Sequence, residues 1–462
     1  MKTKNEVLFA QTPVPKAVIT LVIPTIISQI ITVIYNMADT FFIGQMNDPN
    51  QVAAATLIMP PFVLLTGIAN LFGIGGASLL SRSLGAGDRE KASRCAGFSI
   101  RWAFVVSLLY GLLIFALRSV LFPLLGSDAY TYKYCCDYAL WVLAVGSVPT
   151  VLSACLAHLV RAEGCAKEAA FGIAMGGILN MLLDPLLMFA LHMGVTGAAV
   201  ATMLSNMAAL VYFILLISKR RGQSVIRLSL RGGSGVAREI LLVGFPSFVM
   251  TLMGTFSNTI LNKMVVSYSN QAIAGMGIAK KIDMLAFAIA TGMTQGVLPL
   301  IGFNFAAKNY RRMRSVIKTA FLYTVTLAVL GTLFLTICAV PVVRFFIGDA
   351  ATVAYGQHFL RIIALSCPAI AVTMMVICIF QATGQKKRPM VLSLLRKGGL
   401  DVPFMFLMNG LVGANGIPWA TPMADALSML TAICLFLPTW RQLREKEKET
   451  ERLQAAPESE GI

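Results

Sequence analysis

Apolar residues along this chain fall into stretches of roughly 20 residues, separated by short polar connections. Each stretch is long enough to cross a ~30 Å hydrocarbon core as an α-helix. A loop or an open sheet in lipid would leave backbone groups unpaired, so helices are expected. The pattern predicts twelve transmembrane helices, near 17–42, 52–79, 96–117, 137–159, 170–191, 196–217, 238–265, 271–299, 318–340, 357–381, 389–410 and 415–438.

The same pattern occurs twice, at an offset near 220 residues. NQVAAA at 50–55 matches NQAIAG at 270–275, and GVTGAAVAT at 194–202 matches GANGIPWAT at 413–421. The predicted fold is therefore an all-α integral membrane protein of two six-helix bundles, related by a pseudo-two-fold axis along the membrane normal. Transporters use such parallel repeats to expose a central site to alternate sides of the membrane.

The repeat also predicts the domain organisation. The expected parts are an N-terminal bundle over 1–217, a basic cytoplasmic linker over 218–237, a C-terminal bundle over 238–440 and a charged cytoplasmic tail over 441–462.

Composition agrees with a membrane protein. Of the 462 residues, 57% are hydrophobic and only 13% are charged, and the mean hydropathy is +0.76. A soluble protein would carry about 25% charged residues. The nine cysteines form no C-x-x-C pair, which predicts neither a disulfide framework nor a structural metal. The N-terminus lacks a cleavable signal pattern, so the first span is expected to belong to the mature protein.

The net charge of +17 could indicate a nucleic-acid partner, but the distribution of the basic residues argues against one. They cluster in alternate connections, at 82–101, 219–238, 308–318 and 386–388, while the opposite connections hold few. Basic loops stay cytoplasmic. Both termini are therefore predicted to be cytoplasmic, and no nucleic-acid partner is expected.

Two acids lie within the spans of the N-terminal half. Asp39 is in the outer part of the first span, and Asp184 is just past the middle of the fifth. Asn180 lies four residues before Asp184, on the same helix face. Thr202 lies about two turns into the sixth span, at a matching depth. These oxygen ligands suit a hard cation, or the two carboxylates could share a proton; hydrogen bonding to a neighbour at the membrane interface is the simpler alternative.

Weaker candidates surround this set. Tyr35 and Asn36 lie one turn before Asp39 and could donate to it, Pro24 gives the helix a place to bend, and Gln29 could face the same cavity.

The C-terminal half departs from this pattern, because Leu261 stands where the repeat places Asp39. Asn258 and Asn262 lie nearby as possible cavity residues. This half carries its own intramembrane charges, among them Lys280, Asp283, Arg396, Lys397, Asp401 and Asp425. Lys280 and Asp283 are three residues apart and could pair; Arg396 and Lys397 could pair with Asp401 or extend toward the interface. Structural ion pairs and a gating or relay role are both open.

Several motifs together resemble one known family. The duplicated halves, NMADTFFIGQ at 36–45, SRSLGAGD at 81–88 and ILNMLLDP at 178–185 are similar to those of the multidrug and toxic compound extrusion (MATE) transporters, over about 15–438. Within that family the chain looks most like the prokaryotic DinF-like, MepA-type branch.

The resemblance implies a multidrug efflux antiporter in the bacterial inner membrane that exports cationic, amphipathic drugs or dyes in exchange for Na⁺ or H⁺ by alternating access. The family's cation site matches Asp39, Asn180, Asp184 and Thr202 here, with Tyr35 at a neighbouring polar position. We expect no enzymatic activity, no cofactor beyond the coupling ion, and a functional monomer surrounded by membrane lipids.

Other functions compete with drug export. A flippase for lipid-linked oligosaccharides would use a cavity lined with cationic residues, which the lysines and arginines of the C-terminal half leave open. A membrane-embedded enzyme would need a motif such as D-D-x-x-D or H-E-x-x-H, and the sequence contains neither. A structural or sensory membrane protein is disfavoured by the short loops.

Overall fold

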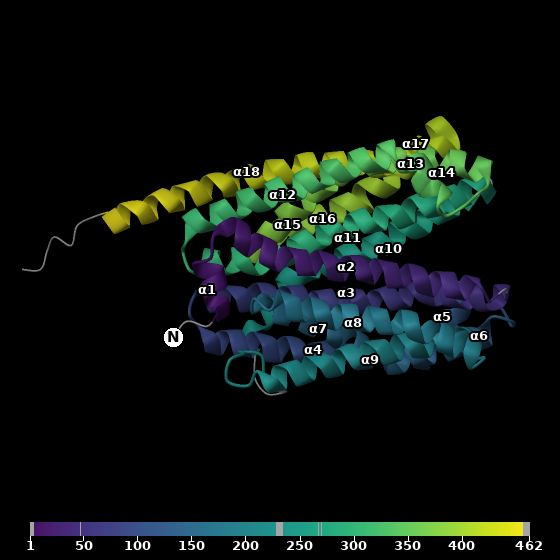
Figure 1. Ribbon diagram of the computed structural model, residues 1–462, viewed down its shortest axis with the longest axis horizontal. Helices are drawn as coiled ribbons and strands as arrows, with labels where there is room; N and C mark the ends of the chain where they lie inside the picture. Colours follow the sequence, from purple (N-terminus) through teal and green to yellow (C-terminus); the bar gives the residue numbers. More distant parts are fainter. Residues whose placement is uncertain (1–3, 47, 228–233, 267, 269, 456–462) are drawn as a thin grey trace, which may run out of the picture. The chain divides into compact units, whose positions relative to one another are not determined.

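The computed structural model describes residues 4–46, 48–227, 234–266, 268 and 270–455, and every regular element in these ranges is a helix (Figure 1). Residues 228–233 of the predicted linker and 456–462 of the predicted tail lie outside the described residues.

The six predicted spans of the N-terminal half all form helices. The unbroken ones are α2 (Val14–Gly44), α3 (Pro49–Gly85), α4 (Arg89–Ala116) and α9 (Val195–Lys219). The fourth span comprises α6 (Tyr132–Ala139), the π-helix η1 (Leu140–Val145) and α7 (Ser147–Ala162), and it bends by 44°. Pro149, which cannot donate a backbone hydrogen bond, is the third residue of the part after this bend. The fifth span, α8 (Ala166–Pro185), ends at a proline and continues as the π-helix η2 (Leu186–Ala190).

The C-terminal half repeats this arrangement. Its unbroken helices are α10 (Ala237–Val266), α11 (Asn270–Ala306), α12 (Tyr310–Ile337) and α18 (Ala420–Ala455). The fourth span of this half consists of α14 (Ala350–Ala364) and α15 (Cys367–Ala382), bent by 41°. The fifth consists of α16 (Lys387–Leu394), the π-helix η4 (Leu395–Asp401) and α17 (Val402–Val412).

Several short helices were not predicted. They are α1 (Lys4–Ala10), α5 (Arg118–Leu125), α13 (Ala339–Arg344) and the 3₁₀ turns η3 (Ser234–Val236), η5 (Gly413–Asn415) and η6 (Ile417–Trp419). η6 falls inside the predicted span 415–438. The others lie before the long apolar stretches or largely between them, where hydropathy carries no signal.

The predicted fold class is confirmed. In the described part of the chain, nine helices are long and apolar enough to cross a membrane, and two bent pairs bring this to eleven. The remaining predicted span, the eleventh (389–410), corresponds to the composite segment 387–412, where charged residues of η4 interrupt the apolar run.

The helices group into two compact units that do not follow the chain halves. The N-unit contains 23–80 and 90–260; the C-unit contains 1–22, 81–89 and 261–462. Most of α10 thus joins the N-unit, because Gly244 lets it approach the backbone of Leu71 on α3: a Cβ added at Gly244 would lie 1.8 Å from the Leu71 carbonyl oxygen. The division within α2 falls beside Pro24, and the predicted domain boundaries remain a prediction.

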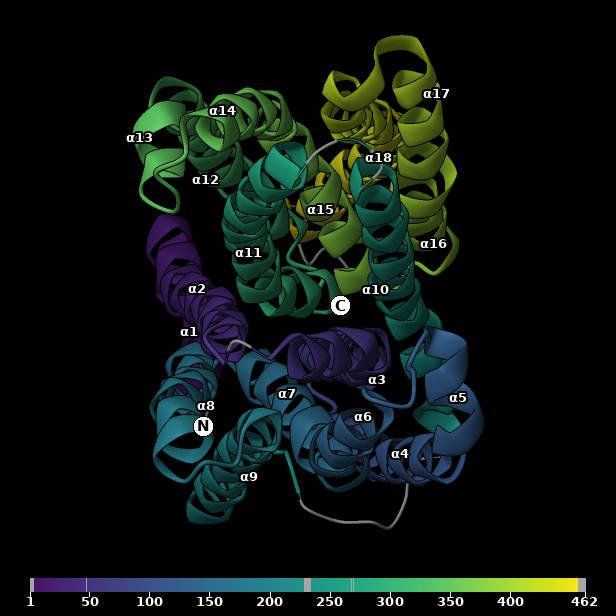
Figure 2. The same cartoon turned by 90° about the vertical axis from the view of Figure 1, so that its right-hand side faces the viewer.

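Within the N-unit, α7, α8 and α9 pack side by side (Figure 2). The helices approach closely because small residues line the contact: a Cβ on Gly172 of α8 would lie 2.6 Å from the Phe213 ring of α9. This packing holds α8 and α9, which carry most of the predicted site, against each other.

Within the C-unit, α11 packs on α14 and α15, and α15 packs on α18. The described part of the predicted charged tail, 441–455, extends α18 rather than forming a separate segment. Glu447 forms an ion pair with Arg314 of α12, whose guanidinium lies 4.8 Å from the Trp440 ring.

Candidate cation site and charge network

The N-unit brings three of the predicted site residues into direct contact. Asn180 and Asp184 are one turn apart on α8, and the Asn180 Nδ2 lies 3.3 Å from Asp184 Oδ1. The same amide nitrogen lies 3.4 Å from Thr202 Oγ1, near the start of α9. Asn180 is 2% exposed and Asp184 is fully buried, so the cluster is shielded by protein.

Asp39, on α2, interacts electrostatically with Asp184 of this cluster. Its side chain is buried, and its charge acts on Asp184. Two neighbouring carboxylates repel each other when both are ionised, and a proton or a bound cation relieves that repulsion. The predicted pairing of the two acids at one depth stays a prediction.

The cluster contains unsatisfied oxygen atoms. Asp39 Oδ1, Asn180 Oδ1 and Asp184 Oδ2 are buried and accept no hydrogen bond. Buried polar atoms nearly always have a partner, and an orphan acceptor is a place for an ion, a water or a proton. The three oxygen types present here, carboxylate, amide and hydroxyl, are ligands that hard cations prefer. The residues therefore fit a Na⁺ ion or a proton.

Two tyrosines complete the surroundings. Tyr35 interacts electrostatically with Asp39, and its ring packs where Gly177 of α8 has no side chain. The expected donation from Tyr35 to Asp39 stays a prediction. Tyr138 of α6 is buried and interacts with both Asp39 and Asp184. Sequence reasoning missed Tyr138, because one tyrosine in an apolar span carries no distinctive signal.

Among the weaker candidates, Asn36 hydrogen-bonds within its own helix. The Asn36 amide donates to the Thr32 carbonyl of its own helix, at 2.8 Å, rather than to Asp39. Gln29 and Pro24 are half-buried on α2, and the side chains of Asn258 and Asn262 on α10 are exposed.

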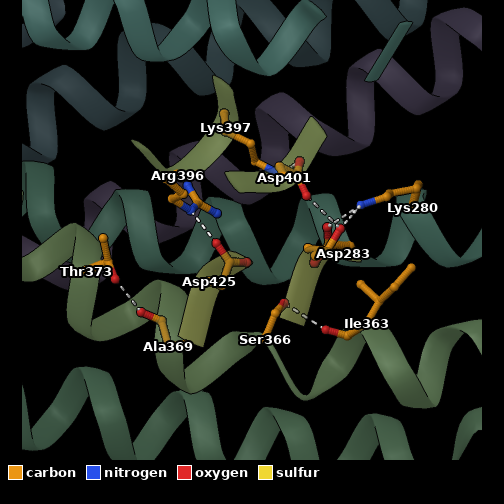
Figure 3. Close-up of polar contacts among 11 residues, drawn as sticks. Lys280, Asp283, Ile363, Ser366, Ala369, Thr373, Arg396, Lys397, Asp401 and Asp425 are labelled. Carbon is orange, nitrogen blue, oxygen red and sulfur yellow. Dashed lines mark hydrogen bonds and ion pairs between the residues drawn. The ribbon is translucent and has the colours of Figure 1, made fainter. Parts of the chain in front are cut away.

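A second polar cluster lies in the C-unit, between η4, α11 and α18 (Figure 3). Arg396 Nε lies 2.6 Å from Asp425 Oδ1, and both side chains are at most 2% exposed. Lys397 Nζ lies 3.0 Å from Asp401 Oδ2, one turn further along η4. Lys280 lies 3.7 Å from Asp283, which agrees with the predicted pair. We call these six residues the charge network.

The expected alternatives for Arg396 are resolved by this geometry. Arg396 forms an ion pair with Asp425 of α18, and Lys397 forms one with Asp401. The guanidinium also lies 5.6 Å from the Phe287 ring of α11. Sequence spacing could not select the partner on another helix.

Comparison with known proteins identifies the family. The MatE family model matches residues 24–186 and again 246–407, one stretch in each repeat half. The chain belongs to the MatE family. This confirms the resemblance seen in the sequence.

Named relatives of this MatE protein include the Multidrug export protein MepA of Staphylococcus aureus, strain N315. It is 30% identical over 443 residues, which cover 94% of this chain and 96% of the relative. A protein of the same name from Staphylococcus saprophyticus is 29% identical over 436 residues, with the same coverage of both chains.

Solved structures share the fold of this MatE chain. One, described as the outward-facing conformation of a multidrug resistance MATE family transporter of the MOP superfamily, aligns with a TM-score of 0.89 at 23% identity and covers 97% of this chain and 100% of that one. Another, described as MATE in the straight conformation, has the same TM-score and coverage at 22% identity.

Proposed function

We propose that this protein is a secondary active multidrug efflux transporter that exports cationic, amphipathic compounds in exchange for Na⁺ or H⁺ by alternating access. The MepA relatives, named as multidrug export proteins and matched over nearly their whole length, support the export function. The observation that supports ion coupling is the cluster of Asp39, Asn180, Asp184 and the half-buried Thr202, in which buried oxygen atoms of the first three residues lack hydrogen bonds.

The cluster would drive transport through its affinity for the coupling ion. Asp39 comes from α2, while Asn180 and Asp184 come from α8, so an ion or proton held by both acids draws two helices together. A ligand shifts a conformational equilibrium only when it binds one state more tightly than the other. An arrangement of α2 that separates Asp39 from Asp184 would have lower ion affinity, and the ion gradient would then bias the transport cycle.

The charge network argues against a flippase for lipid-linked oligosaccharides. Such cargo needs cationic side chains that are available to its pyrophosphate, whereas Lys280, Arg396 and Lys397 each lie within ion-pair distance of an aspartate. Cationic compounds are therefore the better supported cargo.

We further place the protein in a bacterial inner membrane, with both termini in the cytoplasm and the monomer as the functional form. The basic connections at 82–101 and 308–318 support this orientation, since such loops stay cytoplasmic.

Dye efflux from energised vesicles tests the coupling. Asp39→Asn keeps the side-chain shape but removes the charge, and we expect gradient-driven efflux to fall by about 5- to 150-fold, the usual range for coupled sites. Dye binding to the purified protein should persist. Efflux should be measured under an imposed Na⁺ gradient and, separately, under a pH gradient, which also distinguishes the two ions.

Asp137→Asn is the matched control, because this half-buried acid of α6 lies outside the cluster. It should transport normally. Normal efflux by Asp39→Asn under both gradients would contradict the proposed coupling.

A further inference from the structure

The C-unit contains an apolar pocket between the start of α12 and the middle of α18, two helices that pack together (Figure 1). Its volume is about 380 Å³, and it is lined by Ile317, Lys318, Phe321, Phe436, Leu437 and Trp440. The centre of the Phe436 ring lies 5.7 Å from that of Phe321 on the other helix and 5.8 Å from that of Trp440. The walls are therefore aromatic and aliphatic, and Lys318 is the charged side chain among them.

The pocket lies at the level where both helices leave the hydrocarbon core. The span predicted over 318–340 begins at Lys318, and the span predicted over 415–438 ends two residues before Trp440. Tryptophan is enriched at this boundary between hydrocarbon and headgroups. In the proposed orientation the basic connection 308–318 places the boundary on the cytoplasmic side. A lipid of the cytoplasmic leaflet therefore has its headgroup and the first part of its chains at the height of the pocket.

The helix α12 exposes much of its surface to the membrane. Only 11% of its most apolar stretch of 18 residues is buried within the protein, against at least 33% for the other long apolar helices of the described chain. At the pocket itself, Leu322 of α12 is 64% exposed and Leu437 of α18 is 48% exposed. Surrounding lipid chains therefore contact both helices where the pocket lies.

The charges that remain available around the pocket are positive. Glu447 of α18 already forms an ion pair with Arg314 of α12. Lys318 and Arg444, which lies one turn beyond the pocket on α18, are exposed, and neither forms an ion pair with a described residue. The next acid, Glu445, lies about 100° further around the helix than Arg444. These two cations repel a cationic ligand and attract a phosphate, to which lysine and arginine donate strong hydrogen bonds.

We propose that this pocket binds an anionic glycerophospholipid of the cytoplasmic leaflet. One acyl chain lies against the aromatic walls, and the phosphate is held by the Lys318 ammonium and the Arg444 guanidinium. Basic pockets between transmembrane helices on the cytoplasmic side suit anionic headgroups. A zwitterionic lipid binds less well, because its own cationic group faces the same two side chains. The inference uses the proposed orientation and is independent of the coupling ion and the cargo.

Quenching of Trp440 fluorescence by brominated lipids tests this site. The chain has four tryptophans, and replacement of the other three by phenylalanine makes Trp440 the sole reporter. The full-length protein is reconstituted in mixtures of phosphatidylcholine and phosphatidylglycerol, with bromine on the acyl chains of one lipid or the other. At equal mole fraction, phosphatidylglycerol should quench more strongly. Free glycerol 3-phosphate should leave the quenching unchanged, because it has no acyl chain to occupy the pocket.

Substitution of the two cations shows whether the pocket itself causes the preference. Lys318→Gln and Arg444→Gln should each lower the preference for phosphatidylglycerol by roughly 5-fold, the contribution of one basic residue near a membrane surface. Arg221→Gln, which removes an exposed cation of the N-unit, should leave the preference unchanged. Equal quenching by the two lipids, no quenching by either lipid, or an equal effect of all three substitutions would overturn the proposal.

Native mass spectrometry covers the case in which the protein with a single tryptophan does not fold. The parent with all four tryptophans should retain phosphatidylglycerol in preference to phosphatidylcholine, and Lys318→Gln should retain less of it. Equal retention of both lipids, or a dimer that retains neither, would contradict the site. Asp39→Asn should retain the lipid like the parent, so a failure of the proposed ion coupling is distinguishable from a failure of the lipid site.

Discussion

Glu163 shows how a single buried acid can organise a connection between helices. It follows the last residue of α7, and its carboxylate accepts the backbone N–H of Val225 at 2.6 Å and of Ile226 at 3.2 Å. The Ser224 hydroxyl donates to both carboxylate oxygens at 2.8 Å. The start of the basic linker is therefore fastened to the end of α7 by one side chain.

We expect Glu163→Ala to lower the free energy of unfolding by about 1–3 kcal/mol, because the Val225 N–H loses its acceptor. The Ile226 N–H keeps the Ser224 hydroxyl, at 3.0 Å. Glu163→Gln retains an acceptor oxygen and should cost less. Glu90→Gln, an exposed acid of α4, is the control and should be nearly neutral. Chemical or thermal unfolding in detergent measures all three variants, and equal stability of Glu163→Ala and the parent would contradict the fastening role.

The same residue predicts a pH dependence. Burial raises the pKa of Glu163, and the hydrogen bonds from the linker lower it by less. The folded state then holds this proton more tightly than the unfolded chain does. The associated stability is present below the ordinary glutamate pKa and is lost as the pH rises through the raised folded pKa. Over that window the Tm of the parent should fall relative to that of Glu163→Gln.

Residue chemistry made part of the candidate site predictable. The four-residue spacing of Asn180 and Asp184, and the similar depth of Thr202 in the membrane, predicted that these side chains lie close together. Tyr138 and the partner of Arg396 could not be predicted in this way. Both depend on how one helix is rotated against another, which hydropathy does not specify.

Glycine residues, which have no side chain, let neighbouring helices approach each other closely at several positions. Gly244 of α10 faces the Leu71 carbonyl oxygen of α3, and a Cβ on Gly75 would lie 2.2 Å from the Ile240 carbonyl oxygen. Both contacts are to backbone, which cannot rotate away as a side chain can. They explain why most of α10 groups with the N-unit although it begins the second repeat.

Gly244→Ala should therefore destabilise the N-unit by about 1–3 kcal/mol, the usual cost of overpacking. Gly254→Ala in the same helix is the matched control, because a Cβ there would meet nothing within 4 Å. It should be neutral or stabilise by up to about 1 kcal/mol, since alanine favours a helix more than glycine does. The Tm of each variant measures the change in stability, and equal effects of the two substitutions would contradict the close contact at Gly244.

At the element scale, sequence predicted the long helices well and their interruptions poorly. The spans follow from apolar runs that no other structure can carry through lipid. The π-helices η1, η2 and η4 were missed, because a wider turn changes the backbone hydrogen bonds and leaves the hydropathy unchanged. Within η4, the Gly398–Gly399 pair and the charges beside it were the available signal, since glycine weakens a regular helix.

The whole molecule is expected to have one orientation, set by its basic connections. Arg221 lies two residues after the end of α9, Lys133 is the second residue of α6, and both side chains are exposed. An even number of spans places both ends of the chain on one side of the membrane. Because basic loops remain in the cytoplasm, Arg221 should face the cytoplasm and Lys133 the outside.

Cysteine labelling in membrane vesicles tests this orientation. In a background with the nine native cysteines replaced, Arg221→Cys should react with an impermeant maleimide in inside-out vesicles and stay protected in right-side-out vesicles. Lys133→Cys should show the reverse pattern. Each variant is the control for the other, since both lie at exposed helix ends and differ only in the predicted side. Labelling of both from the same side would contradict the three spans predicted between the two positions, whereas exchange of the two patterns would invert the molecule and place the basic linker outside.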